Sequence, residues 1–297
     1  MNGTKKCRKT WQKTPAFLYI ITGLVLIYLL LPVLIVIPMS FSSTEMLSFP
    51  PKGLSLRWYT KFFTESNWVS AALTSLKISI GTVVLSGTLG IVAALGLSKK
   101  IMSGNKALKL ALMLPMMLPA VIVAVSLYMT YSGWELVGTF RGIILAHTCL
   151  AVPYVVNMVS AAMTGLDPSH YDAARSLGAG HWTAVRKVII PLIKPAIFSS
   201  LLFAFVTSWD ETVIVLFLSN SKTMTLPRLI YSELKYGISP IIAAVSSMLI
   251  CITLFIFIIT RILGGMSPQA RAARLNAKLE RELMKNERMP GKANAGS

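Results

Sequence analysis

Six long apolar runs divide the sequence, and each is long enough to cross a membrane as a helix. A bilayer core requires about 20 apolar residues per helix. The first run exceeds the apolar core of about 7–15 residues found in signal peptides, and it lacks a clear small-residue cleavage site. The pattern predicts an all-α polytopic membrane protein with six transmembrane helices. The runs are 16–41, 69–97, 108–131, 142–164, 192–218 and 241–262.

The polar segments between these runs predict one membrane domain with two tails. No linker separates two domains, so we expect a tail over 1–15, a six-helix membrane domain over 16–263 and a second tail over 264–297. The outer loop after the first run mixes aromatic and basic residues over 56–63, which favours a short interfacial helix.

Composition excludes a soluble enzyme. Hydrophobic residues make up 54% of the chain and charged residues 13%, whereas a soluble domain carries about 25% charged residues. The net charge of +18 lies in loops and tails rather than on one folded face, which argues against nucleic-acid binding. Cys7, Cys149 and Cys251 lie far apart and predict neither a metal site nor a disulfide framework.

The distribution of Lys and Arg predicts the orientation. The two tails, the second-to-third loop and the fourth-to-fifth loop together hold 21 basic and 5 acidic residues, whereas the alternate loops hold 7 and 4. Basic residues are retained on the cytoplasmic side. We therefore expect both termini in the cytoplasm.

The inner loop over 165–191 carries the strongest local signals. Asp167 is suited to cap a helix and Pro168 to occupy its first position, while Gly178 is suited to end it. A second helical stretch is expected over 181–190, broken by Pro191. A helix, a sharp glycine turn and a second helix form an element that projects from a membrane toward a partner.

This loop resembles the coupling loop of bacterial ABC importer permeases, which reads E-A-A, three residues, G, nine residues, I, one residue, L-P. Here Asp172-Ala173-Ala174 is followed at the same spacing by Gly178 and by Val188-Ile189-Ile190-Pro191. The resemblance implies a type I ABC importer permease fold and a helix that docks on an ATPase subunit. The residues implied in coupling are Asp172, Ala173, Ala174, Arg175, Leu177, Gly178 and Pro191.

Other stretches resemble spermidine/putrescine-type permeases within that family. They are Leu56-Arg57-Trp58-Tyr59, Ser208-Trp209-Asp210-Glu211, Leu226-Pro227 and Ile238-Ser239-Pro240. The resemblance implies a small amine-containing solute such as a polyamine. Permeases for aminophosphonates, opines and amino-acid derivatives share much of this pattern, so those solutes stay open.

Asp210 and Glu211 are the only acidic residues within a predicted span. Ionisable groups in a bilayer are costly and face a cavity or a partner. Together with Trp209 they are candidates for a cation site on the translocation path, and the alternative is structural pairing with a basic residue. His147, in the fourth run, is interpreted as an interior histidine, and no residues are expected to bind a metal.

The resemblance also implies the partners. The chain contains no G-x-x-x-x-G-K-[ST] motif, so we expect a transport subunit that binds no cofactor, with ATP and Mg²⁺ held by separate ATPase chains. Two ATPase subunits, a second permease and an outer substrate-binding protein are implied, in the bacterial inner membrane. An ion-gradient-driven transporter using Asp210 and Glu211, and a membrane scaffold without transport, are the alternatives.

Overall fold

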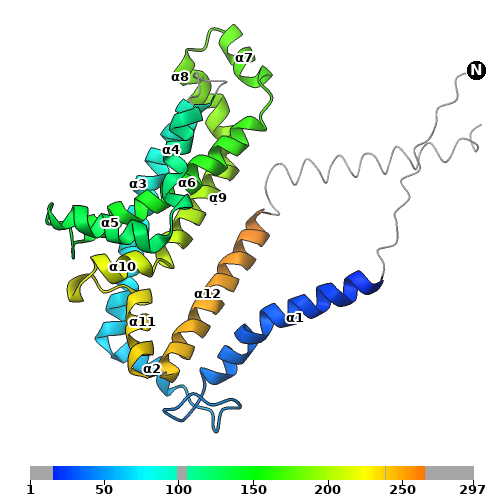
Figure 1. The fold of residues 1–297 in the computed structure, drawn as a ribbon. Helices are drawn as coiled ribbons and strands as arrows, with labels where there is room; N and C mark the ends of the chain where they lie inside the picture. The colour runs from blue at the N-terminus through cyan, green and yellow to red at the C-terminus, as the bar shows by residue number, and fades with distance from the viewer. Residues whose placement is uncertain (1–15, 99–105, 238, 265–297) are drawn as a thin grey trace, which may run out of the picture. The chain divides into compact units, whose positions relative to one another are not determined.

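The computed structural model describes residues 16–98, 106–237 and 239–264 (Figure 1). Within these ranges the regular structure is helical, apart from one isolated β-bridge between Ser42 and Leu54. The described residues form two compact units, one within 16–59 and 240–264 and the other within 60–239. The predicted tails lie outside the described residues, except for Gly264.

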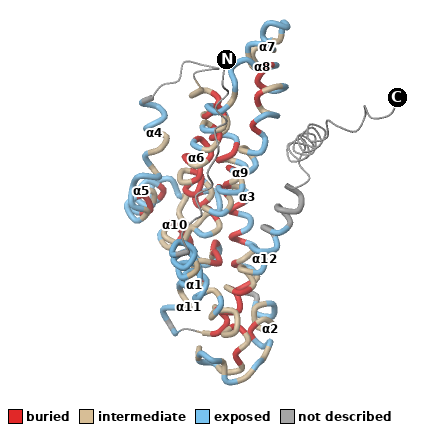
Figure 2. Tube along the Cα trace, turned by 90° about the vertical axis from the view of Figure 1, so that its right-hand side faces the viewer, coloured by how far each residue is buried: buried red, intermediate tan, exposed pale blue. Residues whose placement is uncertain are grey.

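Three long helices form the core of the second unit. They are α3 (Ser66–Leu97), α6 (Phe140–Thr164) and α9 (Ile190–Trp209). Their buried residues follow the length of the three helices (Figure 2). Ala94, Val155 and Ile193 belong to one apolar cluster that joins all three. Small residues on α3 allow this close packing, since interhelical contact in membranes depends on backbones that approach closely.

The third predicted span is correct in position but wrong in shape. It consists of α4 (Lys106–Met117) and α5 (Ala120–Ser132), which are bent by 100° at the break between them. Pro119 stands at the start of α5, and a proline disfavours helical backbone in the residue before it. The apolar run is therefore continuous in sequence while the helix is not.

Apart from the third and fifth, the apolar segments lie where they were predicted. Among the described residues, four helices are long and apolar enough to cross a membrane, or five when the bent pair is counted as one span. The sixth segment is α12 (Pro240–Gly264), whose apolar part is described over Pro240–Phe255. The described chain thus has the all-α, polytopic architecture that the sequence predicted.

The segment that enters α9 corrects a second expectation. Residues His181–Trp209 form one continuous helical segment, made of α8 (His181–Ala184), the π turn η1 (Val185–Ile189) and α9. Pro191 does not break it. Pro191 directly follows the π turn, in which the Ile190 N–H bonds to the carbonyl of Val185, so the helical segment continues through a local change in its hydrogen bonding.

The fifth predicted span is interrupted at its outer end. α9 ends at Trp209, and three residues, Asp210, Glu211 and Thr212, separate it from the short helix α10 (Val213–Leu218). The prediction of one helix over 192–218 is therefore wrong beyond residue 209. The unit continues through η2 (Ser221–Thr223) and α11 (Leu226–Tyr236). The backbone N–H of Leu226 donates to Ser75 Oγ of α3 at 2.8 Å.

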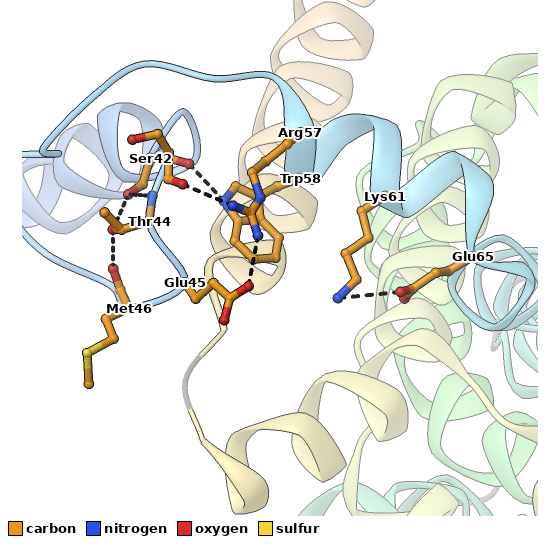
Figure 3. A network of polar contacts seen from close by, with 9 residues as sticks. Ser42, Thr44, Glu45, Met46, Arg57, Trp58, Lys61 and Glu65 are labelled. Carbon is orange, nitrogen blue, oxygen red and sulfur yellow. Dashed lines mark hydrogen bonds and ion pairs between the residues drawn. The ribbon is translucent and has the colours of Figure 1, made fainter.

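The first unit contains α1 (Ala16–Met39), α12 and the first turn of α2 (Arg57–Thr64). Tyr59 Oη lies 2.6 Å from Ser40 Oγ and 2.7 Å from Ser247 Oγ, so one hydroxyl joins the end of α1 to α12. Trp58 Nε1 donates to the carbonyl of Ser42, as Figure 3 shows. The short helix expected in this outer loop is confirmed.

Candidate functional site: the inner loop and the acidic break

The inner loop folds around the local signals that its sequence contains. Its first helix is α7 (Ser169–Ser176), and Asp167 Oδ1 accepts a hydrogen bond from the Ser169 N–H at 2.9 Å. Pro168 already has helical backbone angles. Gly178 has a φ of +84°, the left-handed conformation that glycine adopts without steric cost. The predicted cap and the predicted glycine turn are both confirmed.

Most of the residues implied in coupling are exposed on this chain. No residue of α7 is buried, and Leu177 has 89% of its surface exposed. Asp172 and Ala173 are exposed as well, whereas Ala174 is half-buried. An exposed leucine at the tip of a projecting loop is an apolar group available to a partner.

Arg175 and Pro191 differ from the others. The guanidinium of Arg175 donates to the carbonyl of Ala179 at 2.9 Å, so this side chain braces the glycine turn from within the loop. Pro191 lies in the first turn of α9, beyond the π turn. The structure thus places these two residues in the frame of the loop rather than at its tip.

A contact between Tyr171 and His181 was not anticipated from the sequence. The Tyr171 hydroxyl lies 2.7 Å from His181 Nδ1, and the two rings meet edge to face. This pair ties α7 to the start of α8 across the glycine turn. Both residues belong to the loop, but they are ten residues apart in sequence and meet only because the chain turns at Gly178. Their spacing alone therefore did not predict the contact.

The two acids lie at the break after α9 and have different surroundings. Asp210 occupies the C-terminal cap of α9, where its backbone N–H bonds to the carbonyl of Val206, and its side chain is exposed. Glu211 is half-buried, and its Oε1 accepts a hydrogen bond from the Ile214 N–H at 2.8 Å. Glu211 therefore caps α10, whereas the carboxylate of Asp210 is presented to its surroundings.

Trp209, the third residue proposed for the path, forms a stacked pair with Phe205. Their ring centroids are 5.7 Å apart and the planes differ by 19°. Both side chains are half-buried. Aromatic faces and carboxylates can each attract an ammonium group.

Comparison with known proteins identifies the class. Residues 86–268 match the family described as "Binding-protein-dependent transport system inner membrane component". The match includes α6, the inner loop, the acidic break and all of α12. The chain belongs to this family, and it is a multi-pass transport protein of the inner membrane.

Two curated relatives extend the likeness to nearly the whole chain. The spermidine/putrescine transport system permease protein PotC of Haemophilus influenzae is 29% identical over 248 residues, which cover 84% of this chain and 95% of the relative. The putrescine transport system permease protein PotI of Escherichia coli K12 is 29% identical over 257 residues, with 84% and 89% covered.

A solved structure shares the fold. A chain of a bacterial alginate ABC transporter, crystallised with an alginate pentasaccharide-bound periplasmic protein, superposes with a TM-score of 0.63 at 19% identity. The likeness covers 84% of this chain and 93% of that one. At this identity the comparison concerns the fold, and it confirms the ABC importer permease architecture expected from the inner loop.

Proposed function

We propose that this permease carries a small polyamine-like cation, and that it does so as part of an ATP-driven importer. The observation that carries the proposal is the exposed carboxylate of Asp210 at the break after α9. The relatives named for spermidine and putrescine transport support the same solute class. Family membership favours this function over an ion-gradient-driven transporter or a scaffold.

Asp210 is suited to receive an ammonium group. A carboxylate held in an apolar layer without a counter-charge is costly, and a passing amine would supply that charge transiently. The stacked rings of Phe205 and Trp209 offer an adjacent π face. Glu211 has a different part in this proposal, because its carboxylate already accepts the Ile214 N–H and stabilises α10.

The inner loop supplies the coupling. We propose that α7 and the exposed Leu177 dock on a separate ATPase chain, which binds ATP and Mg²⁺, while this chain binds no cofactor. Two ATPases, a second permease and a substrate-binding protein complete the proposed assembly. Closure of the ATPases would move the docked loops and switch the path between inward and outward access.

The test compares Asp210→Asn with Glu211→Gln in the assembled importer in proteoliposomes. Both substitutions remove a charge and keep the side-chain shape. Asp210→Asn should lower uptake of spermidine or putrescine to a small, measurable residue while ATP hydrolysis stimulated by the binding protein continues. Glu211→Gln should transport normally, since an amide oxygen can still accept the Ile214 N–H.

Two results would contradict the proposal. Normal polyamine uptake by Asp210→Asn would remove this carboxylate from the path and leave the solute class without its chemical basis. Uptake by the wild-type chain in the absence of ATP, driven by an imposed ion gradient, would overturn the ATP-driven importer itself.

A further inference from the structure

A buried polar cluster joins three spans just before the acidic break. His147 of α6 is 2% exposed, and its Nδ1 lies 2.8 Å from Ser208 Oγ in the last turn of α9. Ser208 Oγ in turn donates to Thr82 Oγ1 of α3 at 3.3 Å. The interior position expected for this histidine is confirmed, and one of its two ring nitrogens is bonded to another span.

The directions of these hydrogen bonds follow from the number of hydrogens. Ser208 has a single hydroxyl hydrogen, and that hydrogen goes to Thr82. The imidazole of His147 therefore donates from Nδ1 to Ser208 Oγ. Within the described part of the chain, His147 Nε2 is buried without a hydrogen-bond partner. The contact with Ser208 is thus the polar contact that orients this ring.

The position of Ser208 gives the cluster its significance. Ser208 precedes Asp210 by two residues, and Asp210 is fixed to the same last turn through its bond to Val206. A buried polar group is costly unless it is hydrogen-bonded, so the cluster favours one axial position and one rotation of the end of α9. That placement determines where the exposed carboxylate stands.

Another buried serine of α9 shows that burial alone does not make such a link. Ser200 is fully buried, but its Oγ donates to the carbonyl of Ile197 within the same helix at 2.7 Å. Ser208 and Ser200 are therefore matched in residue type, helix and burial. They differ in whether the hydroxyl reaches another span.

We propose that His147, Ser208 and Thr82 are positioning residues that hold Asp210 at the substrate path. The inference rests on the proposed function, because it assigns the cluster a role through Asp210. In this proposal, contacts among α3, α6 and α9 fix the position of the Asp210 carboxylate. Without them, the end of α9 would be free to move and the carboxylate would move with it.

The experiment compares Ser208→Ala with Ser200→Ala, each alone and combined with Asp210→Asn, in the assembled importer. The readout is the number of spermidine molecules taken up per ATP hydrolysed. Ser208→Ala should lower this ratio about tenfold, the size expected when a charge-assisted contact is misplaced. Ser200→Ala should leave it near the wild-type value. The double variant Ser208→Ala/Asp210→Asn should equal Asp210→Asn, because both act through one carboxylate.

A second pair protects the test against a variant that fails to assemble. Thr82→Val is nearly isosteric and removes the hydroxyl that accepts from Ser208, whereas Thr82→Ser keeps it. Uptake per ATP should fall in the first variant and recover in the second. A purely structural role would instead lower assembly and ATP hydrolysis together, and would leave their ratio to uptake unchanged.

The outcomes separate the two proposals. If Asp210→Asn leaves only a small residual uptake while Ser208→Ala and Thr82→Val keep the wild-type ratio, the path stands and the positioning role is wrong. If the effects of Ser208→Ala and Asp210→Asn add independently, the positioning role is also wrong. If Asp210→Asn transports normally, the path assignment fails and the positioning role fails with it.

Discussion

A single glycine determines how closely two spans approach. Gly90 of α3 faces Val155 of α6, and a Cβ built on Gly90 would lie 2.7 Å from both Cβ and Cγ1 of Val155. Val155 is fully buried within the apolar cluster shared by α3, α6 and α9. Since Val155 is β-branched and stiff, it cannot move aside by changing the end of a flexible chain.

We predict that Gly90→Ala destabilises the helix bundle by about 1–3 kcal/mol, the usual cost of overpacking a well-filled core. Gly96→Ala is the matched control, because it lies in the same helix and a Cβ there meets nothing within 4 Å. The thermal midpoint of the purified protein in detergent measures the effect. Equal midpoints for the two variants would show that the contact with Val155 is not restrictive.

At the scale of the helices, local signals were predictable and changes of direction were not. The expected span over 142–164 corresponds to Phe140–Thr164, and the expected cap at Asp167 and turn at Gly178 are present. Apolar character does not encode direction, so the 100° size of the bend between α4 and α5 could not be read from the run, although Pro115 and Pro119 marked it as a place where the helix could loosen. Likewise, Val213–Leu218 is apolar and reads as part of one span, although α9 ends at Trp209.

The candidate site was predictable as a set of residues but not as a geometry. The sequence singled out Asp210 and Glu211 together, and it left open which acid faces the path. Their difference arises from one hydrogen bond, between Glu211 and the Ile214 N–H, which exists because a new helix begins there. The hydroxyl and imidazole partners His147 and Ser208 are 61 residues apart, so only tertiary structure joins them.

For α7 we predict that Leu177→Asp prevents co-purification of the ATPase subunit. Leu177 is exposed, so the substitution should leave this chain folded and change stability by no more than about 0.5 kcal/mol. A carboxylate buried in the docked contact without a partner would weaken the complex by several kcal/mol, about a hundredfold or more. Leu54→Asp, at a leucine 80% exposed elsewhere in the chain, is the control. Retention of the ATPase by Leu177→Asp would exclude this docking face.

At the scale of the whole molecule, the distribution of basic residues predicts which loops face the cytoplasm. In a background without Cys7, Cys149 and Cys251, a cysteine at Trp134 should react with an impermeant maleimide added outside intact cells. A cysteine at Leu177 should react only after the membrane is opened. Both native side chains are exposed, so access to the reagent is set by the membrane. Outside labelling at Leu177 would reverse the orientation.

The π turn at Val185–Ile189 makes the length of the inner loop matter as much as its composition. It joins α8 to α9 without a break and accommodates one more residue than an α-helical turn would. Each residue turns an α-helix by about 100°. A one-residue deletion here would therefore rotate α7 and α8 by a similar angle about the axis of α9. Among relatives, substitutions within this turn should therefore be tolerated far more readily than insertions or deletions.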